Sequence, residues 1–223
     1  MPSRELITTR DGSHSLLHTT LNETYHSVHG AVQESRHVFI ANGLDHWFSL
    51  HPDRNPDIFE VGFGTGLNAL LTLDRALELQ VKINYATIEA FPIARELWSV
   101  LNYADSPARM GRFIALHEAS WDLDHDLYPL FKFHKYYKTL ESITLLPEAF
   151  DVIYYDAFAP AKQPEMWTFD LLEKVVHALR PEGCFITYCA KGQLKRDLRA
   201  LNLTVETLPG PPGKKEMVRA TKA

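Results

Sequence analysis

Residues 60–66 read Glu60-Val61-Gly62-Phe63-Gly64-Thr65-Gly66, and this stretch decides the fold class. The run 57–61 is a short apolar segment typical of a buried strand, and residues 67–73 have the apolar spacing of a helix start. Glycines between a strand and a helix let the backbone turn tightly and come close to a ligand. The stretch therefore predicts a strand–loop–helix unit that binds a nucleotide-like cofactor.

The spacing of the glycines indicates which cofactor this loop binds. The dinucleotide fingerprint requires G-x-G-x-x-G, and here Leu67 occupies the position of its third glycine. The pattern E-x-G-x-G-x-G is instead typical of S-adenosylmethionine (SAM) methyltransferases, whose cofactor carries no pyrophosphate. We therefore expect a SAM site that includes Glu60, Gly62, Gly64, Gly66 and Asn68.

The rest of the chain alternates between strand-like and helix-like segments, which indicates a parallel, doubly wound sheet. The last two strands have no helix between them, so they must pair antiparallel. We expect an α/β fold: a Rossmann-like class I SAM-dependent methyltransferase with a seven-stranded, mostly parallel sheet and a terminal antiparallel hairpin. The predicted strands span 57–61, 83–88, 113–116, 150–155, 183–189, 203–208 and 217–220, and the predicted helices span 66–79, 92–103, 165–179 and 192–200.

Two further segments fall outside this alternation. Residues 131–146 are rich in aromatic side chains and alternate in polarity, so they predict an inserted hairpin. Residues 1–50 contain two hairpin-like stretches followed by a candidate helix at 30–44. We expect residues 1–50 to form a small N-terminal appendage that packs on a methyltransferase domain of residues 51–223.

Composition and charge narrow the location and the partners. No run approaches the ~18 apolar residues of a membrane span, and the N-terminus MPSRELITTRDG lacks the apolar core of a signal peptide. We expect a cytoplasmic protein with no membrane partner. The net charge is −5, yet residues 191–223 hold eight Lys or Arg against three acids, so the rest of the chain carries −10. The basic segment is either a surface for a polyanion or a solvated helix and hairpin.

The 11 histidines do not form a recognisable metal motif. His14 and His18 are four residues apart, and His26 and His29 are three apart. No H-E-x-x-H, C-x-x-C or carboxylate-rich cluster accompanies them. We therefore expect no metal site.

Polar residues at the ends of the predicted strands are the next candidates, because ligands bind beyond the carboxyl ends of strands in such sheets. Glu89 ends the second strand, where a carboxylate can accept hydrogen bonds from ribose hydroxyls. Residues 118–122 follow the predicted third strand, where an adenine edge should lie. Either Trp121 or Asp122 could contact it, and a core role for Trp121 also stays open.

Asp156 ends the predicted fourth strand, over the expected position of the reactive methyl group. A carboxylate there suits an amine acceptor. A primary alkylamine resembles lysine, with a pKa near ~10.4, and is mostly charged at neutral pH. Only the neutral amine has the lone pair needed for displacement at the methyl carbon, so Asp156 can accept the proton or orient the N–H. The same carboxylate also stabilises the ammonium and raises its pKa, so desolvation of the pocket must oppose this effect.

The run Asp156-Ala157-Phe158-Ala159-Pro160-Ala161-Lys162-Gln163-Pro164-Glu165-Met166-Trp167 resembles the signature of the tRNA 5-aminomethyl-2-thiouridine methyltransferase family. That family is the methyltransferase half of a bifunctional wobble-uridine enzyme whose other half is a FAD-dependent oxidase. Residues 60–68 resemble its cofactor loop, and Glu89-Ala90-Phe91-Pro92 its second strand end. Tyr25-His26-Ser27, residues 30–39 and Gly213-Lys214-Lys215-Glu216-Met217 resemble its N-terminal block and closing strands.

This resemblance implies SAM-dependent N-methylation of 5-aminomethyluridine, usually 2-thiolated, at the wobble position of tRNA. The product is the 5-methylaminomethyl form, and Asp156 is the residue expected to contact the reacting amine. A chain of 223 residues has no room for the FAD domain. We therefore expect a separate oxidase or an upstream aminomethyl-forming pathway to supply the substrate. The run 118–122 differs from the Gly-Asp ending of the bifunctional members.

The tRNA anticodon loop is the expected partner. Its wobble base must leave the anticodon stack to reach a pocket, and Phe158 is the candidate to line it, with Tyr25 and Ser27 from the N-terminal block. The run 132–138 interleaves basic and aromatic residues, which is typical either of single-stranded RNA contact or of a core hairpin. The candidates for phosphate contacts in loops at the catalytic end are Lys162, Lys191, Lys214 and Lys215.

Two other functions compete with tRNA methylation. A small-molecule SAM enzyme, either a methyltransferase or an aminopropyltransferase, would also use an acid at the end of the fourth strand, although the basic segment counts against it. A non-catalytic SAM-fold module would be expected to have lost some of Glu60, Glu89 and Asp156. Methyl transfer from labelled SAM that requires tRNA would discriminate between these readings.

Overall fold

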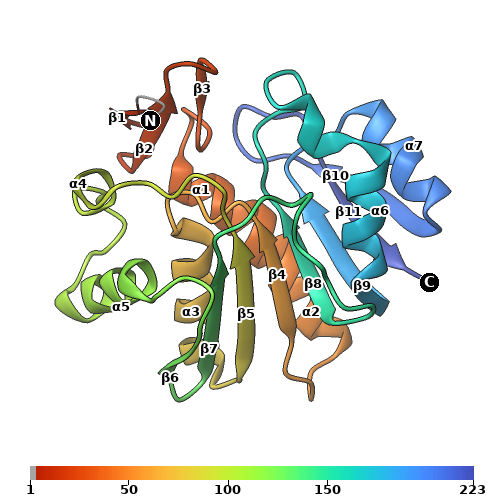
Figure 1. The fold of residues 1–223 in the computed structure, drawn as a ribbon, viewed down its shortest axis with the longest axis horizontal. Helices are drawn as coiled ribbons and strands as arrows, with labels where there is room; N and C mark the ends of the chain where they lie inside the picture. The colour runs from red at the N-terminus through yellow and green to blue at the C-terminus, as the bar shows by residue number, and fades with distance from the viewer. Residues whose placement is uncertain (1–3) are drawn as a thin grey trace.

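The computed structural model describes residues 4–223, so residues 1–3 of the expected appendage lie outside the described residues. Its centre is an eight-stranded sheet in the order β10-β11-β9-β8-β4-β5-β7-β6 (Figure 1). Five strands at its centre pair parallel, and β6, β10 and β11 form the antiparallel pairings at the two edges. The α/β doubly wound fold class is confirmed, with β6 as one strand more than expected. The bounds are β4 (Asp57–Val61), β5 (Ile83–Ile88), β6 (Asp124–Tyr128), β7 (Phe131–Tyr136), β8 (Phe150–Tyr155), β9 (Leu179–Thr187), β10 (Leu203–Pro209) and β11 (Glu216–Lys222).

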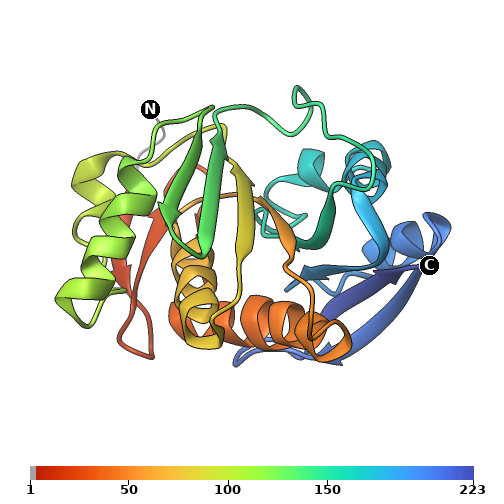
Figure 2. The same cartoon turned by 90° about the horizontal axis from the view of Figure 1, so that it is seen from below.

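Helices cover both faces of the sheet (Figures 1 and 2). One face packs against α3 (Leu67–Leu79) and a long helix made of α1 (Ala31–Ser35), η1 (Arg36–Leu44) and α2 (Asp45–Leu50). The other face packs against α6 (Phe169–His177) and α7 (Gly192–Ala200). Each face has its own apolar core. This explains why β4 and β8 are buried on both sides and read as nearly continuous apolar runs.

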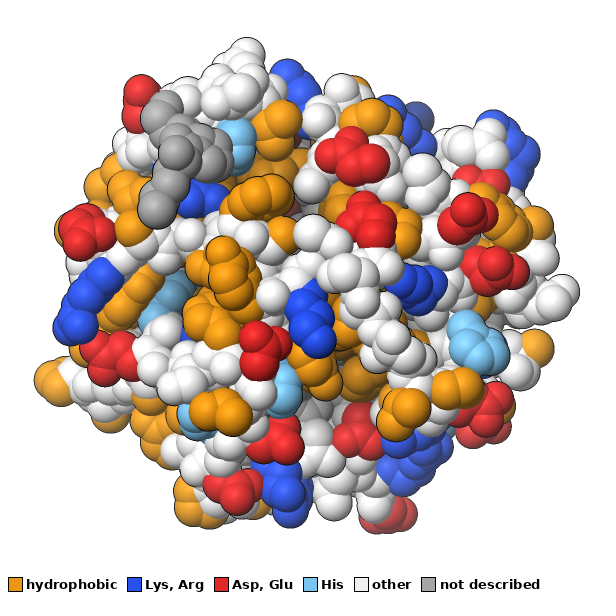
Figure 3. All heavy atoms as spheres, viewed as in Figure 1, with side chains coloured by type: hydrophobic (Ala, Val, Ile, Leu, Met, Phe, Trp, Pro, Cys, Tyr) orange, Lys and Arg blue, Asp and Glu red, His pale blue; other side chains and the backbone are white. Residues whose placement is uncertain are grey.

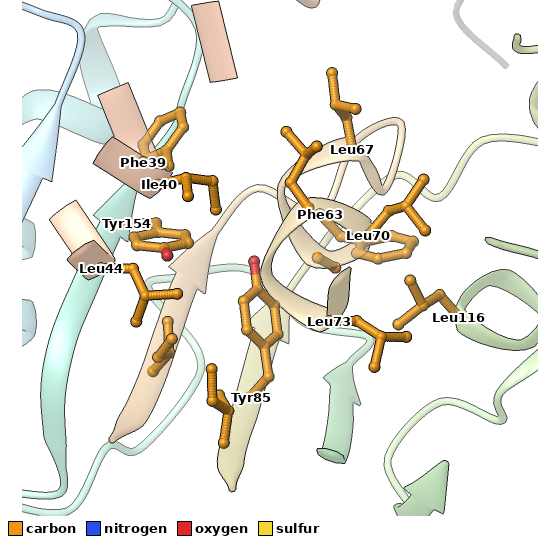
Figure 4. Packing of buried hydrophobic residues seen from close by; sticks show 14 of the residues in the cluster. Phe39, Ile40, Leu44, Phe63, Leu67, Leu70, Leu73, Tyr85, Leu116 and Tyr154 are labelled. Carbon is orange, nitrogen blue, oxygen red and sulfur yellow. The ribbon is translucent and has the colours of Figure 1, made fainter. Parts of the chain in front are cut away.

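The long N-terminal helix belongs to the core of the main sheet. Its central part, η1, is a π-helix of nine residues. Figure 4 shows Phe39 and Leu44 of this helix beside Tyr154 of β8, and Tyr85 of β5 beside α3. The helix comes close to the sheet at Gly43, where a Cβ atom would lie 3.1 Å from Ile186 Cγ2. The helix expected over 30–44 is therefore confirmed, and it continues to Leu50. Whether residues 1–50 form a separate unit stays a prediction.

The strand expected over 113–116 is wrong, because these residues lie in helix α5 (Pro107–Glu118). Phe113 and Leu116 are buried at the i, i+3 spacing of a helix face. Ser106 and Pro107 form a helix start, since Ser106 Oγ accepts from Arg109 N and Pro107 occupies the first turn. A short apolar run of four residues could not by itself distinguish the two structures.

The parallel strand next to β5, which was expected at 113–116, is instead β7. It lies within the stretch that was expected to form an inserted hairpin. It pairs parallel with β5 and antiparallel with β6. Phe131, Phe133 and Lys135 point into the protein and are fully buried. The interleaved run 132–138 is therefore largely core strand, and the expectation of a hairpin over 131–146 is corrected.

The other departures concern helix length. The helix expected over 92–103 is only the single turn α4 (Arg95–Trp98). The helix expected over 165–179 divides into a 3₁₀ turn, η2 (Pro164–Trp167), and α6. The break falls at Thr168, whose backbone is extended.

The N-terminal strands form a small separate sheet at the carboxyl ends of the main strands (Figure 1). It consists of β1 (Arg4–Thr8), β2 (His14–His18) and β3 (Glu23–Thr24), all antiparallel. Asn102 fixes it to the segment after α4, because Asn102 Oδ1 accepts from His14 N at 2.7 Å and Asn102 Nδ2 donates to Gly12 O. The small sheet therefore forms one wall of the space beyond the carboxyl ends of the main strands. No helix within residues 4–223 is long and apolar enough to cross a membrane.

Candidate active site

A cavity of about 600 Å³ opens at the carboxyl ends of β4, β5, β7 and β8. This volume lies in the range of small-molecule sites. Its walls come from the small N-terminal sheet, the glycine loop (residues 61–66), the loops after β5, β7 and β8, and the β10–β11 loop. Of the expected site residues, those that line it are Tyr25, Ser27, Gly62, Gly64, Asn68, Glu89, Asp156, Phe158 and Lys214.

The glycine loop takes backbone conformations that favour glycine. Gly62 and Gly64 have φ angles of +95° and +48°, which side-chain-bearing residues rarely adopt. A Cβ atom on Gly62 would lie 3.0 Å from Asp156 O, and one on Gly64 would lie 3.2 Å from Tyr25 Cδ1. The missing side chains therefore let the loop pack closely against Asp156 and Tyr25 at the edge of the cavity.

Glu60 lies beneath the glycine loop and does not line the cavity. It is fully buried, and its Oε2 accepts from Thr87 Oγ1 at 2.8 Å. Burial raises the pKa of Glu60 to about 8. Glu60 therefore stabilises β4 below the glycine loop through its bond to Thr87. Its buried position does not allow direct contact with a cofactor in the cavity. Gly66 is also outside the lining, because it begins α3 with a φ of +73° against His117.

Glu89 follows β5 and faces the cavity, as expected from its strand-end position. Its Oε2 accepts from Gly64 N at 3.1 Å, and its Oε1 accepts from Phe91 N at 2.8 Å. These bonds fix the carboxylate against the glycine loop. Each carboxylate oxygen keeps further acceptor capacity for ribose hydroxyls.

Trp121 and Asp122 do not line the cavity, because the strand that was expected to place them there is helix α5. Trp121 instead packs near Phe63, with the Lys135 ammonium 4.5 Å from its ring centroid. Asp122 accepts a hydrogen bond from Tyr137 N. The loop after the true third strand supplies this wall of the cavity, with Lys138, Thr139, Leu140 and Glu141.

Asp156 follows β8 and is partly exposed to the cavity. Asn68 of α3 donates from Nδ2 to Asp156 Oδ2 at 2.8 Å, which joins two expected site residues. Burial, and next the Glu34 carboxylate, raise the pKa of Asp156 to about 7. A carboxyl group with this pKa can exchange a proton near neutral pH.

Aromatic rings form the outer wall above Asp156. Phe158 contacts Tyr25 edge-to-face at 5.0 Å between ring centroids, and His18 lies 5.8 Å from the same ring. Arg4 Nε donates to Tyr25 Oη at 2.7 Å and fixes that ring. The expected residues Tyr25 and Phe158, 133 positions apart, are therefore brought together at the mouth of the cavity.

The four lysines expected to contact phosphate are separated by the structure. Lys162, Lys191 and Lys215 do not line the cavity, and Lys191 and Lys215 are exposed. Lys214 points inward, and its Nζ lies 2.5 Å from Glu34 Oε1. The same Nζ lies 3.6 Å from the centroid of the Tyr188 ring. Lys214 is therefore held at the cavity wall by Glu34 and Tyr188, and its contact with a phosphate stays a prediction.

Glu34 and Tyr188 line the cavity and were not identified from the sequence. Glu34 is buried on α1, and its Oε2 accepts from Ser27 N at 2.6 Å. Tyr188 follows β9, and its Oη donates to Ala157 O at 2.9 Å. A glutamate in an amphipathic helix resembles any solvated charge, and only its packing against the β10–β11 loop reveals it. Its place in the N-terminal block that carries the resemblance was the one signal available.

Comparisons with known proteins agree with this geometry. Residues 135–223 match a family model described as S-adenosyl-L-methionine-dependent methyltransferase. This part of the chain is similar to these methyltransferases. The similarity supports the cofactor that the glycine spacing predicts.

More specific relatives are proteins named tRNA 5-methylaminomethyl-2-thiouridine biosynthesis bifunctional protein MnmC. The one from Pseudomonas savastanoi pv. phaseolicola is 30% identical over 211 residues, which cover 90% of this chain and 32% of that protein. The one from Idiomarina loihiensis is 32% identical over 223 residues, which cover 90% of this chain and 36% of that protein. The chain thus spans about a third of the length of these relatives, and the resemblance seen at residues 156–167 is confirmed.

The crystal structure of MNMC2 from Aquifex aeolicus shares the fold. It aligns with a TM-score of 0.82 over 100% of this chain and 71% of that chain, at 21% identity. The likeness extends over the N-terminal sheet as well as the main sheet, because the whole chain is covered.

The residues present fit S-adenosylmethionine. Gly62 and Gly64 line the cavity without side chains, and Glu89 beside them offers acceptors for ribose hydroxyls. The loop 138–141 forms a further wall of the cavity. Asp156 lies at the opposite side of the glycine loop, where its backbone oxygen approaches Gly62. These residues would hold the cofactor, which would supply a methyl group for transfer.

Proposed function

We propose that this protein methylates the amino nitrogen of 5-aminomethyl-(2-thio)uridine at the wobble position of tRNA, giving the 5-methylaminomethyl form. The observation that carries the proposal is Asp156, a carboxyl group with a pKa raised to about 7 between the glycine loop and the ring pair of Tyr25 and Phe158. The names of the relatives supply the nucleoside. The proposal concerns the methylation step alone.

The chemistry requires a neutral amine beside a positively charged sulfur. S-adenosylmethionine supplies the methyl group on that sulfur. Asp156 accepts a proton from the substrate ammonium, so that nitrogen has a free lone pair. The N–C bond forms as the C–S bond breaks, the bonding pair stays on sulfur, and the product leaves as a secondary ammonium. Asn68 holds one carboxylate oxygen, so the carboxylate cannot rotate away from the nitrogen.

The ring pair gives the extruded base a stacking surface. Single-stranded RNA bases are bound in this way by aromatic side chains, at about 1–3 kcal/mol per base. The exposed Lys191 and Lys215 and the half-buried Lys162 are the proposed phosphate contacts. We further propose that the tRNA substrate places the reaction in the cytoplasm, and that a separate oxidase or an aminomethyl-forming pathway supplies the amine.

The test is methyl transfer from labelled S-adenosylmethionine to three tRNAs that carry 5-aminomethyl-2-thiouridine, 5-carboxymethylaminomethyl-2-thiouridine or an unmodified wobble uridine. Mass spectrometry of the digested nucleosides should show 5-methylaminomethyl-2-thiouridine from the first tRNA alone. Equal labelling of the unmodified tRNA would refute the proposed nucleoside. Labelling of polyamines in the absence of tRNA would instead support a small-molecule enzyme.

A further inference from the structure

An ion pair crosses the inner wall of the cavity next to Asp156. Lys214 from the β10–β11 loop meets Glu34 from α1 at 2.5 Å, and the two residues are 180 positions apart. Glu34 is 5% exposed, so the pair is largely withdrawn from water. Both side chains line the cavity. An ion pair in this position changes the pKa of any titratable group that enters the cavity.

Both oxygens of Glu34 are already occupied. Oε1 pairs with Lys214, and Oε2 accepts from Ser27 N at 2.6 Å. These two contacts hold the Glu34 carboxylate in one orientation, with part of its charge neutralised by Lys214. Lys214 is held in turn by Glu34 and by the face of the Tyr188 ring, at 3.6 Å from its centroid. The cation is fixed in the cavity and does not extend into solvent, unlike its exposed neighbour Lys215.

A fixed cation opposes the charge that a carboxylate alone would favour. Asp156 stabilises an ammonium and makes the nitrogen harder to deprotonate. A neighbouring ammonium has the opposite effect, because it lowers the pKa of an amine in the same pocket. Glu34 limits this effect by neutralising part of the Lys214 charge. The balance of the two side chains decides how readily the substrate loses its proton.

We propose that the Glu34–Lys214 pair is a positioning device that sets the charge of the cavity so that the acceptor amine binds Asp156 and gives up its proton there. This rests on the proposed function. The pair makes the site selective for an amine that can be neutral, and it disfavours permanently charged amines. Neither residue touches the reacting atoms in this proposal. Both act through Asp156.

The charged and titratable groups around Asp156 come from several elements. Lys214 and Glu34 act on it from the β10–β11 loop and from α1, and they oppose each other: Lys214 lowers the pKa of Asp156 and Glu34 raises it. Glu60 of β4 and Tyr85 of β5 face it from below, and Tyr188 faces it from the end of β9. His26 lies near the pair, and burial lowers its pKa to about 4, so it is neutral near pH 7.

The test measures Asp156 directly, without substrate. The full chain, labelled with ¹³C at the aspartate carboxyl carbons, is titrated by NMR, and Asp156→Asn identifies the Asp156 signal. Wild-type Asp156 should titrate near pH 7. Glu34→Gln should move the midpoint down and Lys214→Met should move it up, each by roughly 1 unit, the lower end of shifts caused by a neighbouring charge. The double variant Glu34→Gln/Lys214→Met should return toward the wild-type value.

Lys215→Met is the matched control, because it removes the same charge one position away on an exposed side chain. It should leave the midpoint unchanged. Midpoints that stay fixed in both single variants, or that move in the same direction, would overturn the proposal. If Glu34→Gln does not fold, the comparison of Lys214→Met with Lys215→Met still decides the question.

Enzyme assays provide the second arm. The acidic limb of kcat/KM against pH should shift in the same directions as the NMR midpoints, because the substrate's own pKa contributes equally in all variants. Shifted NMR midpoints without methyl transfer to aminomethyl tRNA would leave the charge device intact and reject the proposed function. Normal methyl transfer with unshifted profiles would reject the charge device and leave the function intact.

Discussion

Asp156 illustrates how much of its proposed catalytic role depends on surroundings that a sequence does not display. Its place at the end of β8 could be predicted, because a strand run and a following Ala-Phe-Ala-Pro segment are visible in the sequence. Its pKa of about 7 could not be predicted, because burial and the distant Glu34 produce it. A carboxylate with the ordinary pKa of aspartate would be a far weaker base toward an alkylammonium.

Replacing Asp156 by asparagine should reduce methyl transfer by roughly 10²–10⁴-fold, the typical loss for an acid–base group. Asparagine keeps the shape and one acceptor oxygen, so the affinity for S-adenosylmethionine should change no more than a few-fold. The measurements are single-turnover methyl transfer and titration calorimetry. Partial recovery of the rate as pH approaches the pKa of the amine is expected if Asp156 takes the proton. A wild-type rate would remove Asp156 from the mechanism.

Some of the loops at the carboxyl ends of the strands could be predicted from the sequence, and others could not. The glycine loop was predictable because its glycines meet a local backbone requirement, at φ angles of +95° for Gly62 and +48° for Gly64. The wall after β7 was missed because two signals competed. Phe113 and Leu116 of α5 suit either a short strand or a helix face, and the run 131–136 has the alternation of a surface hairpin. Tertiary burial decided both cases, and a single sequence does not contain that information.

The β10–β11 loop provides a test of how one element supports the site. Gly213 has a φ of +86°, and a Cβ atom there would meet the ring of His29. Gly213→Ala should therefore displace the loop that carries Lys214, raise the midpoint of the Asp156 titration and slow methyl transfer. Gly12→Ala is the matched control, since Gly12 has a similar φ of +82° but open space around it.

Both glycine variants should lose about 1 kcal/mol of stability from backbone strain. Chemical denaturation measures that loss. Only Gly213→Ala should change the titration of Asp156. An equal effect of Gly12→Ala on Asp156 would show that general destabilisation, and not displacement of the loop, is responsible.

The buried titratable groups together determine how the stability of the whole protein depends on pH. Burial raises the pKa of Glu60 to about 8, and burial together with Glu34 raises that of Asp156 to about 7. Each contributes stability that is present below its unfolded pKa and is lost as pH rises through its folded pKa. Burial lowers the pKa of His26 to about 4 and that of His117 to about 3. These two contribute stability that is present above pH ~6.5 and is lost as pH falls.

The two effects oppose each other between about pH 4.5 and 6.5, so the free energy of unfolding should change little there. Above pH 6.5 the histidines no longer contribute to the slope, and Glu60 dominates. The stability of the protein without cofactor should then fall by about 2 kcal/mol up to pH 8, at about 1.4 kcal/mol per pH unit. Urea denaturation at pH 5, 6.5 and 8 measures this. Glu60→Gln should remove most of the fall, and an unchanged fall in that variant would contradict the assignment.

The surface seen in Figure 3 carries acidic and basic side chains interspersed. The basic segment 191–223 explains part of this pattern, because several of its cations are paired within the protein. Lys195 pairs with Glu216, and Arg219 pairs with Glu206, and both acids already count in the net charge of the segment. Lys214 pairs with Glu34, which lies outside the segment. The net charge of +5 therefore overstates the free positive charge available to a tRNA.

The Glu34–Lys214 contact also sets the earliest time at which a newly made molecule can complete its cavity. A ribosome that adds 5–20 residues per second makes Lys214 roughly 10–35 s after Glu34. Only after residue 156 has been added, in about the last third of that interval, does the nascent chain hold the glycine loop and Asp156 without the cation that completes the cavity. Synthesis interrupted in this period would therefore release chains that carry Asp156 without the charge of Lys214.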